Sequence, residues 1–319
     1  MVETEKINDS EEEIRENEAE KKCKNRKNRV GSDLVYNIVV YALLAIAALI
    51  YIIPIWHVLN ASFTSVKYIY EGKLLLYPKG FTVKGYEMIF TYGDFWRGYG
   101  NTVFYAILAI LVGIPLTIMA AYPLSRQDFA LKGFIMKVYT VTMFFSGGLI
   151  PTYLLVVGLG LYNSIWALIL PGVSVWNIIV VRSFIMTRIP QEILEAAKLD
   201  GCNNVIFLIK IVVPLSVPVL VVIGLYTFVG QWNSYFSAMI YLDSRSKYPL
   251  QLILREMLVT LTAGDHLPPD ITGGFSDQMA AMEAMKYATI VVASLPVIVL
   301  YLSIQKLFEK GVTLGSLKG

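Results

Sequence analysis

The sequence predicts an all-α polytopic membrane protein with six transmembrane helices, and two observations support this fold class. The 319 residues are 56% hydrophobic and only 16% charged, which gives far more apolar surface than one soluble core needs. In addition, runs of about 20 apolar residues recur along the chain and match the roughly 30 Å hydrocarbon layer of a bilayer. We expect each run to be helical, because a backbone in lipid has to satisfy its own hydrogen bonds.

The apolar runs divide the chain into spans, loops and tails. The predicted spans cover 35–58, 102–124, 134–159, 165–186, 205–230 and 287–307. The predicted organisation is a disordered cytoplasmic tail with a membrane-proximal basic cluster (1–33), a first transmembrane helix (34–58), an extracytoplasmic loop (59–99), a core of five transmembrane helices (100–309) that contains a polar cytoplasmic insert (187–204) and a second extracytoplasmic loop (231–286), and a cytoplasmic tail (310–319).

Basic residues before the first span predict that the amino terminus lies in the cytoplasm. The cluster consists of Lys21, Lys22, Lys24, Arg26, Lys27 and Arg29, and positive charge at a span end stays on the cytoplasmic side. A lipid or nucleic-acid patch is the alternative use of this cluster. The first 20 residues are acidic and carry no apolar stretch, so we expect no cleavable signal peptide and insertion directed by the first span. Six crossings then return the carboxyl terminus to the cytoplasm.

The two long outer loops are expected to differ in structure. Turn residues at 77–80 between short apolar pieces predict strands and turns with a little helix over 59–99. The amphipathic stretch 250–261 predicts a short surface helix in the second loop, followed by an irregular segment. Loops of this length are often functional, and both are expected on the outer side, where a partner protein would dock; plain solvated linkers are the alternative.

Several classes of chemistry lack the residues they need. His57 and His266 are isolated, so no metal site is expected, and Cys23 and Cys202 are both assigned to the reducing cytoplasm. The chain carries no Walker sequence and no nucleophile elbow, which argues against an enzyme, a cofactor site or ATP hydrolysis by this chain alone. A self-contained secondary transporter or channel is the rival, but no Asp or Glu lies centrally in any predicted span.

The polar insert predicts a short helix over 190–200. Pro190 suits a first helical turn, and Gly201 suits the position after a helix end. Ile193, Ala196 and Ala197 fall at helical spacing on one face. Either Asn203 or Asn204 is expected to cap the next helix. The alternative is a hydrated connector with no partner.

Two features suit a route through the bundle. The sequence Ser146-Gly147-Gly148 to Pro151, and the segment around Pro171, predict helix breaks, which either permit close packing or expose backbone groups to a water-filled path. Trp232, Asn233, Tyr235 and Phe236 cluster at the outer end of the fifth span. Aromatic faces and amides of this kind bind sugar rings and hydroxyls, whereas an interfacial aromatic belt is the alternative.

The insert resembles the cytoplasmic EAA loop of permease subunits of binding-protein-dependent ABC importers. The matching residues are Glu195, Ala196, Ala197, Asp200, Gly201, Ile211 and Pro214, and the departures from the common sugar-importer pattern are Leu208 and Val213. Asn101-Thr102, the sequence 120–126 ending at Arg126, 168–171 and 231–236 are similar to the carbohydrate, maltose-transporter-type branch. Residues 145–153 are similar to the subgroup for oligosaccharides derived from complex polysaccharides.

This resemblance implies a MetI-like ABC-importer permease fold with a cytoplasmic coupling helix, in a multi-pass protein of the bacterial plasma membrane. It implies a second unlike permease, two ATPase subunits that bind ATP and Mg, an extracytoplasmic sugar-binding protein, an oligosaccharide substrate and membrane lipid, with no nucleic acid. A permease for a non-sugar solute is the alternative within the family. The resemblance also implies that the carboxyl-terminal tail, with Gly315, Lys318 and Gly319, reaches between the ATPase subunits as an extended strand rather than ending as a frayed tail.

Overall fold

The computed structural model describes residues 36–69, 76–263 and 275–316, and these residues are helical wherever they form regular structure. The chain divides into two compact units, one of residues 1–60 and 74–77 and the other of residues 61–73 and 78–319. The labelled elements are α2 Val66–Ile69, α3 Lys84–Thr91, α4 Gly93–Ser125, α5 Lys132–Phe144, α6 Leu149–Gly158, α7 Trp166–Ile169, η1 Leu170–Gly172, α8 Val175–Arg188, α9 Gln191–Leu199, α10 Asn204–Phe207, the π-helix η2 Leu208–Val212, α11 Val213–Trp232, α12 Phe236–Tyr241, η3 Arg245–Lys247, α13 Leu250–Ala263 and α14 Phe275–Ser316.

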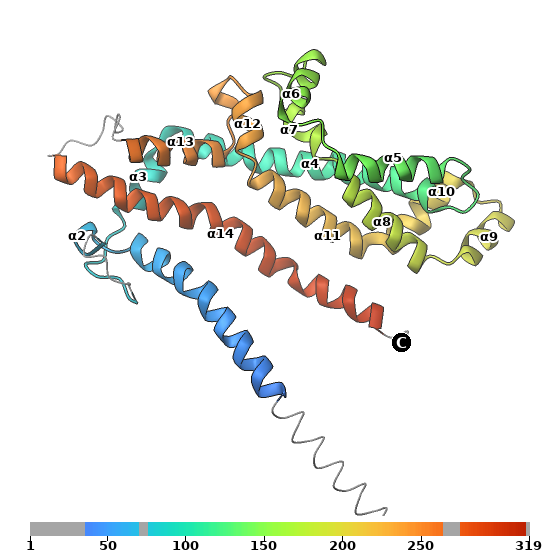
Figure 1. Ribbon diagram of the computed structural model, residues 1–319, viewed down its shortest axis with the longest axis horizontal. Coiled ribbons are helices and arrows are strands. Elements are labelled where there is room, and N and C mark those ends of the chain that lie inside the picture. The colour runs from blue at the N-terminus through green and yellow to red at the C-terminus, as the bar shows by residue number, and fades with distance from the viewer. Residues whose placement is uncertain (1–35, 70–75, 264–274, 317–319) are drawn as a thin grey trace, which may run out of the picture. The chain divides into compact units, whose positions relative to one another are not determined.

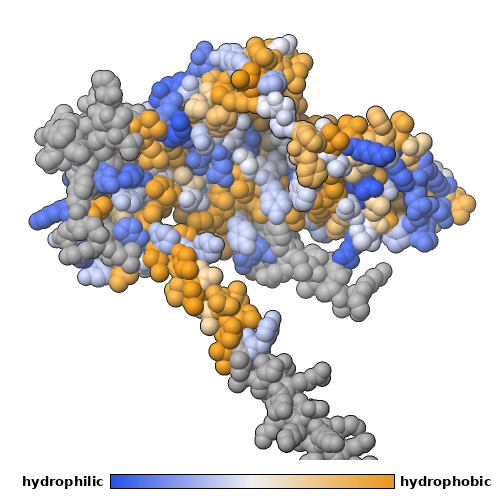
Figure 2. Space-filling view, in the orientation of Figure 1, coloured by the Kyte–Doolittle hydropathy of each residue, from blue (hydrophilic) through white to orange (hydrophobic). Residues whose placement is uncertain are grey.

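The described part of the first unit is mainly a helix that begins at Tyr36; this helix, Tyr36–Ser62, has 27 residues and is long and apolar enough to cross a membrane. Its large apolar side chains, such as Leu43, Ile50 and Ile55, are exposed, and Figure 2 shows them as an apolar surface. An apolar surface of this kind needs lipid or protein around it. Near the end of the helix, the Trp56 indole N–H donates to the Leu76 carbonyl at 2.9 Å.

The second unit is built around α4, which packs along α8 and α11 (Figure 1). One apolar cluster joins these helices to α9 and α10, and includes Tyr122, Ile185 and Phe207. A second cluster joins the start of α4 to α3, the end of α11, α13 and α14, and includes Phe95, Trp232 and Met285. The long helix α4 therefore carries a packed core at each end.

The six predicted spans correspond to four single helices and two bent pairs among the described residues. The single helices are Tyr36–Ser62, Gly93–Ser125, Asn204–Trp232 and Glu283–Ser303. The pairs are Lys132–Phe144 with Leu149–Gly158, bent by 119°, and Trp166–Gly172 with Val175–Arg188, bent by 42°. The helix breaks predicted at Ser146–Pro151 and near Pro171 are therefore confirmed, although the third span is not the continuous helix that its apolar run predicted.

Gly148 explains the sharper break. Its φ of 87° and ψ of 176° lie in a backbone region that is accessible almost only to glycine. The residue precedes the first turn of α6, and its carbonyl accepts the Thr152 hydroxyl at 2.8 Å. Ser146, Gly147 and Gly148 are all exposed at this corner.

Of three expectations about the ends of the bundle, the structure corrects two and confirms one. The described part of 59–99 contains α2, α3 and the start of α4 and no strand, because the apolar residues there pack as helix faces: Ile89 is fully buried in a cluster with Met285 and Ala288 of α14. The surface helix predicted at 250–261 is confirmed as α13, while 264–274 lie outside the described residues. The tail is helical through Ser316 rather than extended, so Gly315 lies within α14; Lys318 and Gly319 lie outside the described residues.

Substitution of Gly148 by alanine is expected to destabilise the second unit by about 1–3 kcal/mol, because alanine carries strain in this backbone region. Gly158→Ala is the matched control, since Gly158 lies in helix α6 and nothing lies within 4 Å of an added Cβ. Thermal unfolding in detergent should show a lower midpoint for Gly148→Ala alone. Equal midpoints for the two variants would contradict the assigned role of Gly148.

Candidate functional site

The short helix α9 is defined at both ends by local sequence. Pro190 precedes its first residue, and Gly201 follows its C-cap with a φ of 77°. The Gly201 N–H donates to the Lys198 carbonyl at 3.1 Å, and the Cys202 N–H donates to the Ala197 carbonyl at 2.9 Å. This pair of bonds around a left-handed residue is a Schellman motif. The predicted helix stop at Gly201 is confirmed.

The chain re-enters a helix directly after this turn. The Asn203 side chain accepts a hydrogen bond from the Ile206 N–H at 2.8 Å, so Asn203, rather than Asn204, is the cap. The next turns form the π-helix η2, where the Val213 N–H bonds to the Leu208 carbonyl. Pro214 has no N–H to donate and cannot continue a regular α-helical ladder, which accounts for the wider turn before it. Pro214 therefore shapes the connection to α11, and Ile211 lies within η2 and packs against the cluster that contains Phe207.

The inner face of α9 packs against the core. Ala197 is 9% exposed, and Leu194 also contacts the cluster that contains Ile185 and Phe207. Ile193 and Ala196 are exposed instead, so the expected single face of Ile193, Ala196 and Ala197 is divided between the core and the surface. Leu199 is 89% exposed. Leu199 was not among the residues predicted for this site. Its position directly before Asp200-Gly201, at the end of the helix, was the signal in the sequence that could have indicated it.

Glu195 and Asp200 are also exposed on this helix and its cap. The Glu195 carboxylate accepts a hydrogen bond from the Gln191 amide at 3.2 Å within α9. The surface of α9 therefore combines a carboxylate with the uncovered apolar residues Ile193, Ala196 and Leu199. We call this the α9 surface.

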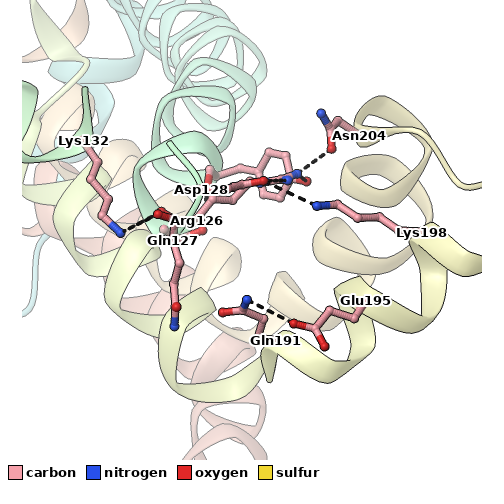
Figure 3. Close-up of polar contacts among 10 residues, drawn as sticks. Arg126, Gln127, Asp128, Lys132, Gln191, Glu195, Lys198 and Asn204 are labelled. Atoms are coloured by element: carbon pink, nitrogen blue, oxygen red, sulfur yellow. Dashed lines mark hydrogen bonds and ion pairs between the residues drawn. The ribbon is translucent and has the colours of Figure 1, made fainter. Parts of the chain in front are cut away.

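Arg126, the C-cap of α4, connects α9 and α10 to the end of α4 (Figure 3). Its guanidinium donates to the Asp128 carboxylate at 2.7 Å and to the Tyr122 hydroxyl at 2.8 Å, and it also donates to the Asn204 side-chain oxygen. Lys198 of α9 lies 3.5 Å from the same Asp128 carboxylate. We call these five residues the Arg126 network.

The Arg126 network positions the helix ends, and its ion pairs add little to the free energy of folding. The Arg126 guanidinium, which donates to Asp128, holds the pKa of that carboxyl well below its usual value, so Asp128 is charged at neutral pH. The side chains of Asp128 and Lys198 are 53% and 50% exposed, and ion pairs in water contribute little. The Arg126 side chain is only 10% exposed, however, and its planar group fixes several partners at defined angles.

A further bond secures the same end of the bundle. The Arg182 Nε–H of α8 donates to the Leu124 carbonyl of α4 at 2.8 Å. Between α4, α8 and α9 lies a small hollow of about 200 Å³ whose lining includes Arg126, Gln191 and Glu195. The ends of three helices thus meet beside the α9 surface.

The residues predicted for a substrate path are divided by the structure. Trp232 is 1% exposed, and its indole N–H donates to the Ala293 carbonyl at 3.0 Å. It therefore serves as a core contact between α11 and α14 and cannot offer its ring to a substrate. Asn233 and Tyr235 are exposed beside it and line a pocket together with residues of α13 and α14. No group of three or more His, Cys, Asp or Glu in the described residues is placed to hold a metal.

Comparisons with known proteins agree with this architecture. Residues 113–314 match the family described as the binding-protein-dependent transport system inner membrane component. The chain is 37% identical over 294 residues, covering 92% of this chain and 100% of the relative, to the polygalacturonan/rhamnogalacturonan transport system permease protein YtcP of Bacillus subtilis (strain 168). It is 34% identical over 277 residues to Protein LplC of the same organism, covering 84% and 90%.

A solved structure is similar as well. A chain from a bacterial ABC transporter involved in the import of the acidic polysaccharide alginate matches with a TM-score of 0.78 and 30% identity, covering 86% of this chain and 97% of that chain. This chain belongs to the family of inner membrane components of binding-protein-dependent transport systems. The predicted importer-permease fold and family resemblance are confirmed.

Replacement of Arg126 by alanine is expected to loosen α9, because hydrogen bonds to charged groups contribute about 1.5–3 kcal/mol. Backbone amides of 191–199 should exchange hydrogen about tenfold faster, whereas Gln127→Ala should leave exchange unchanged. The stabilisation involves an Asp128 carboxyl with a lowered pKa, so it is present in full above about pH 3.9 and is lost as the pH falls toward the lowered value. Unaltered exchange in Arg126→Ala at pH 7 would refute the role of the network.

Proposed function

We propose that this chain is a permease subunit of an ATP-driven importer that translocates oligosaccharides delivered by an extracytoplasmic binding protein. The α9 surface supports coupling to an ATPase. Leu199 and Ile193 are exposed on a short helix between two apolar spans, and exposed apolar residues of this kind indicate a protein partner. An oligosaccharide substrate is supported by the relatives named for polygalacturonan/rhamnogalacturonan transport and for alginate import.

The partner at α9 is an ATPase subunit, and ATP and Mg bind in that subunit rather than in this chain. Two such subunits close on ATP and push on α9 in each permease. The motion reaches the spans by two routes, through the Arg126 network to α4 and through η2 to α11. Alternating access then follows from two states that bind ATP and the loaded binding protein differently.

A second, unlike permease completes the bundle. Large apolar side chains remain exposed along α5 and α6, where Phe144 is 78% exposed, Phe145 75% and Ile150 71%. Such surfaces require lipid or another permease. With both termini in the cytoplasm, the loops at 59–99 and 231–286 face outward, where the binding protein docks.

The decisive experiment is reconstitution of this chain with its second permease and ATPase in liposomes. Uptake of labelled oligosaccharide should require both ATP and the loaded binding protein. Uptake by this chain alone, without an ATPase, would support a self-contained carrier instead.

The variants Gly201→Leu and Glu195→Lys are expected to uncouple ATP hydrolysis from uptake while the complex still assembles. A leucine at the positive φ of Gly201 carries strain of about 1–3 kcal/mol, and lysine reverses the charge on the α9 surface. Uptake per ATP hydrolysed should fall by about tenfold, since 1.4 kcal/mol corresponds to a factor of ten. Gly172→Ala, with open space around it and no positive φ, is the control. Normal uptake and ATPase association in both coupling variants would refute the proposed contact.

The carboxyl-terminal tail, which includes Gly315, Lys318 and Gly319, is proposed to contact the ATPase subunits. Deletion of 315–319 should preserve the bundle and the range of transported sugars but reduce stimulated ATP hydrolysis severalfold. Assembly is checked by size-exclusion chromatography, and hydrolysis by phosphate release. Full stimulation in the truncated complex would mean that the tail makes no such contact.

A further inference from the structure

An open pocket of about 620 Å³ lies beside the carboxyl-terminal end of α11, the end opposite α9. Its walls come from the residues after α11, from α13 and from α14. Half of its lining residues are polar: Asn233, Tyr235, Gln251, Arg255, Thr289 and Ser294. The volume is within the range of small-molecule sites, roughly 300–1,000 Å³.

Arg255 supplies the pocket with a positive charge, and it forms no ion pair with a carboxylate of the described residues. Among the described residues, Arg255 contacts the Met239 sulfur, which lies 3.4 Å from Nη1, and the Tyr235 ring, whose centroid lies 5.4 Å from the guanidinium carbon. Arg245, on the adjacent segment, differs because it is paired with both Asp94 and Glu256. The guanidinium of Arg255 therefore retains its hydrogen-bonding capacity for a ligand anion.

The other polar groups offer hydrogen bonds in several directions. The Asn233 amide donates to the Val229 carbonyl, which leaves its oxygen as an acceptor. Thr289 is only 1% exposed, and its hydroxyl has no hydrogen-bond partner among the described residues. Tyr235 is 40% exposed. Hydroxyl, amide and aromatic groups around one cation suit a ligand with many hydroxyl groups and a negative charge.

The pocket walls are fixed by contacts behind them. The Leu250 N–H at the start of α13 donates to the buried Thr102 hydroxyl of α4 at 2.7 Å, and the Asn101 amide donates to the Tyr248 carbonyl at 3.0 Å. On the other side, the Trp232 indole holds Ala293 of α14. Because hydrogen bonds behind the walls already hold these segments, the side chains that line the pocket are positioned before a ligand binds.

We propose that this pocket is a binding subsite for a carboxylate-bearing sugar ring of the transported oligosaccharide. Arg255 binds the carboxylate in a charge-assisted pair, Asn233 and Gln251 bind hydroxyls, and Tyr235 packs against the apolar face of the ring. The inference rests on the proposed import of oligosaccharides and adds that the substrate is acidic. The acidic polysaccharide named for the similar solved transporter is consistent with this chemistry.

An anionic lipid headgroup presents a similar charge to Arg255. The polar lining residues come from all three wall segments, however, and a sugar ring with several hydroxyl groups engages all of them, whereas a phosphate group needs chiefly the cation. The distribution of hydrogen-bonding groups therefore favours the sugar.

The test measures direct binding of a galacturonate trimer to the assembled transporter in nanodiscs of neutral lipid, by calorimetry and without the binding protein. A galactose trimer, which lacks the carboxylates, is the matched ligand. Arg255→Gln should weaken binding of the galacturonate trimer by about tenfold or more and change binding of the galactose trimer by less than twofold. Arg255→Lys should retain part of the affinity, and Lys84→Gln, an exposed cation outside the pocket, should change neither ligand.

Equal losses for both trimers, no loss for either, or no binding of galacturonate to the native complex would overturn the subsite. An effect of Arg255→Gln that arises only when anionic lipid is added to the nanodiscs would overturn it in favour of a headgroup. Oligosaccharide uptake by the native reconstituted complex is measured separately. If uptake occurs and the pocket test fails, only the subsite is wrong; if no oligosaccharide is taken up, the proposed function is wrong.

Discussion

A backbone inside a bilayer has to satisfy its own hydrogen bonds, and the arrangement of this chain depends on where that requirement is relaxed. Most of the described chain is regular helix. Three departures have an identifiable cause: glycine at a positive φ in Gly148 and in Gly201, and a proline without an N–H after the π-helix η2. Because the helices between them are stiff, these irregular points are where one helix can turn relative to the next.

The two ends of the second unit are joined by α4. This helix has 33 residues and, at about 1.5 Å per residue, spans about 50 Å. Asn101 and Thr102 near its beginning hold α13, while Arg126 at its end holds α9 and α10. A displacement of α9 is therefore transmitted to α4, and α4 is also bonded to α13, which forms a wall of the distant pocket. The packing of α11 along α4 provides a parallel connection between the same two regions.

The parts of this arrangement that depend on local sequence were predictable. Hydropathy located the spans, Gly201 located the end of α9, and the amphipathic run at 250–261 located α13. Contacts between distant residues were not predictable. Arg126 meets Asn204 across 78 positions in the sequence, and Trp232 meets Ala293 across 61. The prediction of strands in 59–99 was wrong because it also depended on contacts between distant residues: packing against α14 overrides the local turn signals.

Trp232 shows how burial changes the interpretation of a residue type. An aromatic cluster at the end of a span suits sugar binding or an interfacial belt, and both uses require an accessible ring. The Trp232 ring instead lies 5.8 Å from both Tyr99 and Phe228, measured between ring centroids. Its indole N–H is bonded within the core. The residue thereby joins α11 to α14 at Ala293, which also lines the pocket of Asn233 and Tyr235. Trp232 affects the pocket through its walls, while the exposed neighbours after it in the sequence supply the groups that reach a ligand.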